Sequence, residues 1–204
     1  MRLFTFVEWR RILVLMIVAL VVNVLGPQAA VAAGPWKAQV VDAETGQPLE
    51  GVVVLMYWIK HTGGPAGWAG AEFYDAEEVV TGPDGRFVVP SRWVFTLNPF
   101  KKVFREMVIF KPGYGQWEFR DAREWEKLPD WESKARREEA WKQFEGDGVV
   151  MELPPLKTRE ERRKYFETRL DSGGSPLIPP ERKKRFYEAE DIERVYLGFR
   201  PLGR

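Results

Sequence analysis

The fold is decided by residues 37–90, which read KAQVVDAETGQPLEGVVVLMYWIKHTGGPAGWAGAEFYDAEEVVTGPDGRFVVP. Within this stretch, residues 42–51 favour a turn. Asp42 can hydrogen-bond the local backbone, Gly46 can adopt a positive φ without a Cβ clash, and Pro48 cannot donate to a strand ladder. We therefore expect two strands on either side of this turn.

The apolar run at residues 52–59 follows the turn directly. It is rich in β-branched and aromatic residues and too short to span a membrane, which predicts a strand covered on both faces. Farther on, Pro-Asp-Gly at 83–85 is a turn signal between residues 78–81 and 86–89. We predict a hairpin there.

Three blocks of this region carry a family resemblance. They are DxxTGxPLxGVxV at 42–54, TxxDGRFxVP at 81–90 and KPGY at 111–114. In this order the blocks resemble the carboxypeptidase regulatory-like domain, a transthyretin-like β-sandwich found as an accessory module in exported bacterial proteins. The resemblance implies a fold and a mostly non-catalytic role. It names no ligand, because function depends on a site rather than on a fold.

Residues 1–32 have the organisation of an export signal. A basic start with three arginines precedes the apolar segment 12–25, and Ala-Val-Ala at 30–32 supplies a small-residue cleavage site. The apolar segment has about 14 residues, fewer than the roughly 20 of a spanning helix. We expect cleavage after Ala32, with an uncleaved anchor as the alternative, and a location in the periplasm or at the surface of a bacterium.

Composition excludes several classes of function. The chain has 31 basic and 30 acidic residues, and removing residues 1–32, with three arginines and one glutamate, changes the net charge from +1 to −1. Such a balance does not favour nucleic acid. The absence of cysteine excludes a disulfide framework and a lipid-anchored lipoprotein. We expect membrane contact only through an uncleaved signal segment.

Residues 61–75 are rich in glycine and aromatic residues, and we predict a long loop there. Long loops on a rigid scaffold are where binding is common. The alternative is that the aromatic rings fold back over the core. The chain has nine tryptophans, and flat rings can stack on sugars or be buried in a core. The candidate binding residues are Trp58, His61, Trp68, Tyr74 and Trp93.

Two regions have helical patterns. In residues 117–146, Trp131, Ala135, Trp141 and Phe144 lie near one helical stripe, which predicts a helical insert.

Residues 157–204 form a second helical region. Thr158 and Glu161 make a capping box at the start of one helix, and a Pro-Pro pair predicts a second helix over residues 181–197. Each apolar stripe is narrow, so these helices either pack on the β-sandwich or dock on a partner.

The sequence gives little support for a catalytic function. Zinc carboxypeptidases need two histidines and a glutamate on the metal, whereas this chain has one histidine, His61, and no cysteine. Serine and cysteine triads also need a base that is usually histidine. A pair of carboxylates can act on a glycan, but no spacing selects one. We therefore predict no enzyme, no metal and no cofactor.

The sequence thus predicts a mainly β protein, a transthyretin-like/immunoglobulin-like β-sandwich over residues 33–156. It has a helical insert at about 117–146 and a short α-helical C-terminal extension at 157–204. The expected function is an exported non-catalytic module that mediates protein interaction in the bacterial cell envelope. The alternative is a carbohydrate-binding module that uses exposed Trp and Tyr of the 61–75 loop.

Overall fold

The computed structural model describes Met16 and residues 32–64, 67–98, 100–117, 122–125, 127–168 and 175–202. The predicted signal at residues 1–32 lies outside these ranges apart from Met16 and Ala32, so its function in export stays a prediction. Within the described ranges, no helix is both long and apolar enough to cross a membrane.

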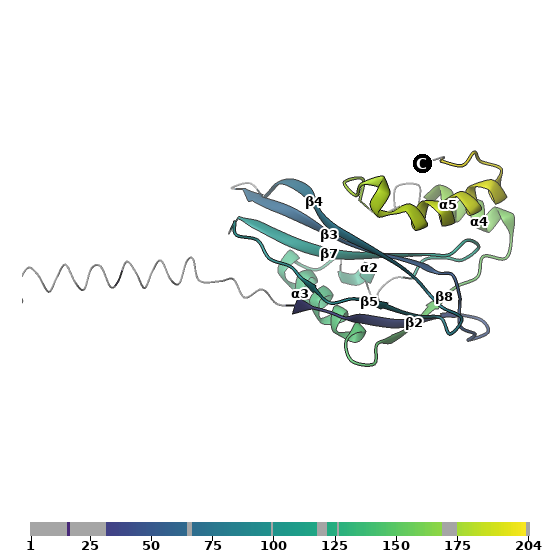
Figure 1. Cartoon of the computed structure of the whole chain (residues 1–204), viewed down its shortest axis with the longest axis horizontal. Helices are drawn as coiled ribbons and strands as arrows, with labels where there is room; N and C mark the ends of the chain where they lie inside the picture. Colours follow the sequence, from purple (N-terminus) through teal and green to yellow (C-terminus); the bar gives the residue numbers. More distant parts are fainter. Residues whose placement is uncertain are drawn as a thin grey trace, which may run out of the picture.

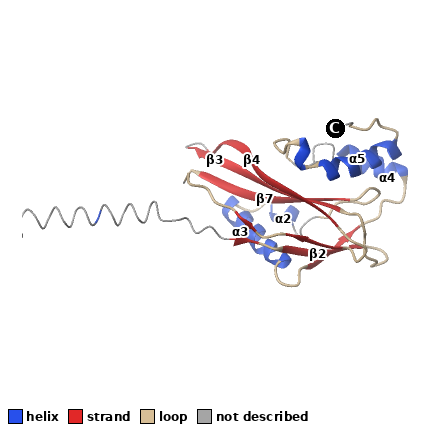
Figure 2. Cartoon of the chain, viewed as in Figure 1, coloured by secondary structure: helices blue, strands red, loops and turns tan. Residues whose placement is uncertain are grey.

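The described chain is mainly strand, with helices in two regions (Figures 1 and 2). The strands are β1 (Ala32–Ala33), β2 (Trp36–Asp42), β3 (Val53–Gly64), β4 (Gly67–Val80), β5 (Arg86–Val89), β6 (Arg92–Trp93), β7 (Lys101–Phe110) and β8 (Val149–Leu153). The helices are α2 (Ala122–Trp125), α3 (Asp130–Trp141), η1 (Lys142–Phe144), α4 (Arg159–Thr168), η2 (Pro180–Arg182) and α5 (Lys184–Leu197).

Two three-stranded sheets form two layers, ordered β5-β2-β8 and β4-β3-β7 (Figure 1). Strand β2 runs antiparallel to β5 and parallel to β8, whereas β3 is antiparallel to both of its neighbours. The short strands β1 and β6 form a separate pair. The predicted assignment to a mainly β class in two sheets is therefore confirmed.

One hydrophobic core lies between the two sheets. It contains Trp36 and Val40 from β2, alternate residues of β3, and Met151 from β8. Trp141 and Phe144, from the end of α3 and from η1, are buried in the same cluster, so the helical insert closes this core. Of the other two residues in the predicted stripe, Ala135 is exposed and the side chain of Trp131 lies outside the described residues.

Strand β3 is buried on both faces, as its apolar composition predicted. Val54 and Met56 face the core between the sheets, while Leu55 and Tyr57 face a second cluster on the outer side. Helix α5 supplies Phe186 to this second cluster. Helices α4 and α5 lie over the outer face of the β4-β3-β7 sheet (Figure 2).

A glutamate of the sheet fixes the start of α5. Glu78 of β4 accepts hydrogen bonds from the backbone N–H groups of Arg185 (3.0 Å) and Phe186 (2.8 Å). These first-turn groups have no partner within the helix, and a carboxylate also complements the positive end of the helix dipole. Of the two alternatives for the C-terminal helices, the structure therefore shows packing on the chain's own sheet.

A buried ion pair joins α4 to α5. Glu193 is 3% exposed and accepts a hydrogen bond from Arg162 Nε (2.8 Å) and a second from Arg162 Nη2. The backbone N–H of Gly113 donates to the same carboxylate at 2.9 Å. The predicted capping box at the start of α4 also forms, because the Glu161 carboxylate accepts from the Thr158 N–H while the Thr158 hydroxyl accepts from the Glu161 N–H. Glu193 therefore holds two helices and one loop together.

The turn at residues 82–85 forms, but the predicted hairpin across it is wrong. Strand β5 pairs with β2 in the other sheet, so the turn crosses between the two layers. The cause lies at Gly85, whose carbonyl accepts the Val40 N–H at 2.8 Å. A Cβ on Gly85 would lie 2.4 Å from the Val40 carbonyl oxygen, so only glycine lets the chain approach β2 this closely.

The predicted loop at residues 61–75 is also wrong, because residues 61–64 continue β3 and residues 67–75 belong to β4, which pairs with β3 as far as Gly64 and Gly67. Shifts in pairing register after Trp58 and after Thr62 accommodate the extra residues of β4. On its other side, β3 pairs with β7 without interruption from Val53 to Thr62. Strand β7 thus runs alongside β3 over its full length, from Lys101 to Phe110.

Candidate functional site

The predicted aromatic candidates do not form one exposed surface. Trp58 is 1% exposed, its ring centroid lies 5.8 Å from that of Trp36, and the Arg92 guanidinium lies 5.1 Å above it. The physical reason is the two-residue period of β3, which puts Trp58 on the same inward face as Val54 and Met56. Trp58 is therefore a core residue, and its assignment to a binding surface was wrong.

The other four candidates lie in different surroundings. Tyr74 is partly buried against the core, with Lys60 Nζ 5.2 Å from its ring centroid. Trp93 is 64% exposed in β6, and the side chain of Trp68 lies outside the described residues. His61 lines a pocket at the edge strand β7. Of the five, the structure thus places His61 in a pocket and Trp93 on the surface.

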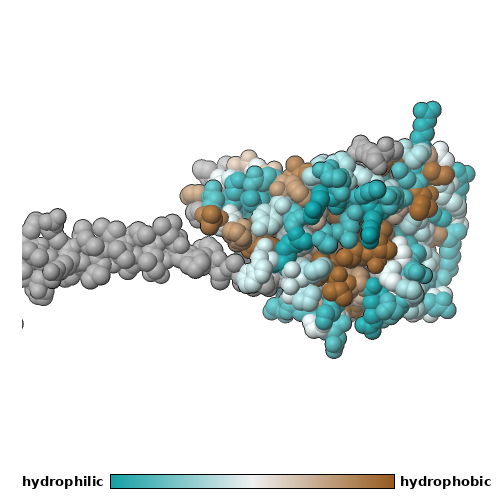
Figure 3. Space-filling model, viewed as in Figure 1, coloured by the Kyte–Doolittle hydropathy of each residue, from teal (hydrophilic) through white to brown (hydrophobic). Residues whose placement is uncertain are grey.

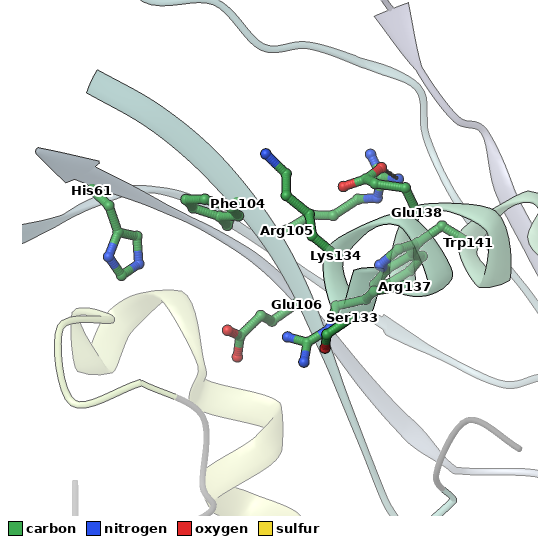
Figure 4. A pocket seen from close by; sticks show the side chains of 9 residues that line it. All are labelled: His61, Phe104, Arg105, Glu106, Ser133, Lys134, Arg137, Glu138 and Trp141. Carbon is green, nitrogen blue, oxygen red and sulfur yellow. Dashed lines mark hydrogen bonds and ion pairs between the residues drawn. The ribbon is translucent and has the colours of Figure 1, made fainter. Parts of the chain in front are cut away.

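The pocket has a volume of about 440 Å³ and lies between β7 and α3 (Figure 4). On the sheet side it is lined by His61 of β3 and by Phe104, Arg105 and Glu106 of β7. The rings of His61 and Phe104 meet edge to face, with centroids 5.2 Å apart. Because β7 is an edge strand, side chains from both of its faces reach the same pocket.

The opposite wall is one face of α3. Ser133, Arg137 and Trp141 are four residues apart, as are Lys134 and Glu138, so the helical repeat brings all five to one side. This wall carries two cations, Lys134 and Arg137, and a single carboxylate, that of Glu138.

Arg105 connects the two walls. Its Nη2 donates to Glu138 Oε2 at 2.6 Å, and its guanidinium lies 5.1 Å from the ring centroid of Trp141. Its Nε is buried and has no hydrogen-bond partner among the described residues. A buried donor of this kind is uncommon, because leaving it without an acceptor destabilises the fold.

Glu106 faces the pocket, and Tyr57 of the neighbouring strand β3 holds its carboxylate in place. The hydroxyl of Tyr57 donates to Glu106 Oε2 at 2.6 Å. Burial raises the pKa of Tyr57, and the neighbouring Glu106 carboxylate raises it further, so the phenol keeps its proton and remains a donor. Glu106 is thereby fixed as a hydrogen-bond acceptor.

Lys134 and Arg137 have no carboxylate partner among the described residues. Lys134 Nζ lies 5.6 Å from the ring centroid of Phe104, and Arg137 is exposed at the pocket rim. Neither side chain forms an ion pair with an acid of the described chain, and Arg137 extends toward Glu106 in Figure 4. Within the described ranges, no group of His, Cys, Asp or Glu residues is arranged to hold a metal ion.

A second exposed feature is the apolar strip, defined as Trp93, Phe95, Leu97 and Phe100. These side chains are 64%, 54%, 93% and 70% exposed. The strip lies beside the β3–β4 tip, because the Gly63 N–H donates to the Phe100 carbonyl at 2.6 Å. Apolar side chains are visible at this end of the molecule in Figure 3.

The polar residues between the strip residues, Thr96 and Asn98, bond to the backbone of their own loop. Asn98 Oδ1 accepts the Phe100 N–H at 2.9 Å, and Thr96 Oγ1 accepts the Asn98 N–H at 3.2 Å. These contacts hold the loop in shape with its apolar side chains outward. The exposed side chains of the strip are therefore mainly apolar.

Comparisons with known proteins give no relative: no family model matches the chain, and no curated protein or solved structure matches it. The site must therefore be interpreted from its own geometry.

Sequence reasoning found His61 but missed the rest of the pocket. Arg105 and Glu106 belong to no motif that singled them out, and Arg137 comes from a helix more than 30 residues away. No local motif links β7 to α3. The i, i+4 spacing of Ser133 and Arg137 was visible, but nothing in it indicated a pocket.

Proposed function

We propose that the protein is an exported module of the bacterial cell envelope, built as a transthyretin-like/immunoglobulin-like β-sandwich, that acts by binding another protein rather than by catalysis. Two facing sheets with one core support the β-sandwich assignment. The signal-like sequence of residues 1–32 supports export to the periplasm or cell surface.

The observation that carries the binding function is the apolar strip. Four large side chains are more than half exposed within eight residues, although each has a transfer free energy that favours burial. Isolated exposed apolar residues are common on proteins, but several large ones within one short segment favour an interaction surface. Aromatic residues such as Trp93 are also those that contribute most at protein interfaces.

The environment of the strip favours a protein over a glycan. Sugar recognition combines an aromatic face with polar groups that orient the ligand. Here Thr96 and Asn98 bond to their own loop instead. With the buried Trp58 removed from the candidate surface, an apolar protein partner fits the exposed groups better.

The pocket also supports binding over catalysis. Its two carboxylates are both engaged in structural contacts, Glu106 with Tyr57 and Glu138 with Arg105. A general base must be free to accept a proton from a substrate.

The test replaces Phe95 by a photo-crosslinking amino acid in the full chain, expressed in a bacterium that exports it. We expect a discrete protein adduct after irradiation. A second change, Leu97→Asp, places a charge in the apolar strip and should abolish the adduct. The matched control is Val150→Asp on β8, which changes an apolar residue of the other sheet that is also more than half exposed and should leave the adduct intact.

Two results would contradict the proposal. One is an adduct that persists in the Leu97→Asp variant, because the strip would then not be the contact. The other is co-sedimentation with purified cell wall or insoluble polysaccharide that Trp93→Ala loses and Val150→Ala keeps, which would establish the glycan alternative.

A further inference from the structure

The pocket between β7 and α3 combines an aromatic side with a cationic rim. The edge-to-face rings of His61 and Phe104 provide the aromatic side. Lys134 and Arg137 provide the rim, and neither is paired with an acid among the described residues. A flat apolar group fits against aromatic rings, and an anion is attracted to unpaired cations. The two sides together thus suit one ligand with both properties.

Lys134 and Arg137 extend from α3 across the pocket toward β7 (Figure 4). Lys134 Nζ lies 5.6 Å from the ring centroid of Phe104, whereas Arg137 extends toward Glu106, whose carboxylate is held by Tyr57. The two cations together thus attract an anionic group, while the flat apolar part of the ligand packs against Phe104.

We propose that this pocket binds a small aromatic anion, a planar ring system that carries a single carboxylate, sulfonate or phosphate group. The volume of about 440 Å³ suits a small molecule and is near the lower end of the usual range for ligand pockets, roughly 300–1,000 Å³. This binding site is separate from the apolar strip and does not depend on the proposed protein partner.

The test uses 2-naphthoate as the probe and protein purified from cells that export it. Affinity is measured by isothermal titration calorimetry for the wild type and for Arg137→Gln. The matched control is Arg136→Gln: Arg136 is the neighbouring residue of α3, pairs with Glu132 at 3.6 Å and does not line the pocket. Circular dichroism checks that both variants stay folded.

We expect binding of 2-naphthoate that Arg137→Gln weakens about tenfold, as for loss of one charge-assisted hydrogen bond, and that Arg136→Gln leaves within about twofold. The neutral analogue 2-naphthylmethanol should also bind about tenfold more weakly to the wild type. Absence of binding at millimolar probe, equal losses in the two arginine variants, or equal affinity for the neutral analogue would each overturn the proposal.

Discussion

The ion pair between Glu193 and Arg162 allows a quantitative prediction about how the C-terminal helices are held. The side chains are 4% and 16% exposed, so both charges are largely removed from water. Glu193→Gln keeps the shape of the side chain but removes its charge. The guanidinium of Arg162 then stays in place without a counter-charge, and the Gly113 N–H competes for the one remaining oxygen.

Removing one partner of a buried ion pair costs about 3–5 kcal/mol, because the other charge stays buried without compensation. Arg162 retains some contact with water, so we expect the lower end, a loss of about 3 kcal/mol in the free energy of unfolding. For a chain of this size, each kcal/mol corresponds to a shift of roughly 2–4 °C in the melting temperature. The expected decrease is therefore about 6–12 °C.

Urea denaturation followed by tryptophan fluorescence measures the change. The control is Glu188→Gln on the same helix, which breaks a surface contact to Lys184 in which both side chains are more than 60% exposed. Such pairs contribute about 0–1 kcal/mol, so the control should remain close to the wild type. A double variant, Arg162→Met with Glu193→Leu, replaces the pair by apolar groups and should recover most of the loss.

The reasoning would be refuted if Glu193→Gln and Glu188→Gln changed the free energy of unfolding equally. Failure of the double variant to recover stability would show that the cost arises from packing around residue 193 rather than from the unpaired charge.

Three further predictions concern pH and the backbone. Hydrogen bonds from the Thr45 and Glu44 N–H groups lower the pKa of Asp42. The ionised carboxylate therefore stabilises the fold above the unfolded pKa of about 4, and this stabilisation is lost as pH falls further. Asp42→Asn should flatten the decline of the urea midpoint below pH 4. Burial raises the pKa of Tyr57, so its stabilisation is present below the unfolded pKa of about 10 and is lost above it; Tyr57→Phe should reduce the fall in midpoint between pH 9 and 11. Gly85→Ala places a Cβ 2.4 Å from a backbone oxygen at φ +71°. It should lower the free energy of unfolding, measured by thermal unfolding, by at least about 3 kcal/mol. Gly46→Ala, at φ +69° but in open space, should lower it by only about 1–2 kcal/mol.

Local chemistry explains which parts of the fold were predictable. The turn after Asp42, the capping box at Thr158 and the doubly buried strand β3 depend on neighbouring residues or on simple periodicity, and all three appear in the structure. The hairpin at Gly85 failed because the partner of β5 is chosen by a contact with β2, more than 40 residues away in sequence. Turn signals predict a change of direction but not the strand that follows it.

The candidate site was less predictable for two reasons. Glycines at residues 63, 64, 67 and 70 suggested a loop, although pairing with β3 keeps the segment in the sheet. Strict alternation from Val54 would have placed Trp58 inside, so that error was avoidable. The pocket, in contrast, needs β7 beside α3, a tertiary contact for which Arg105 and Arg137 carry no signal in sequence.

The burial of β3 on both faces has a consequence for how the protein is made. Leu55 and Tyr57 are synthesised early, yet Phe186, which covers them, lies about 130 residues later in the chain. At roughly 5–20 residues per second, the outer face of the sheet waits on the order of 10 s for α5. Until α5 has been made, these apolar residues lack the helix that covers them in the folded chain, and such exposed surface favours aggregation of incomplete chains.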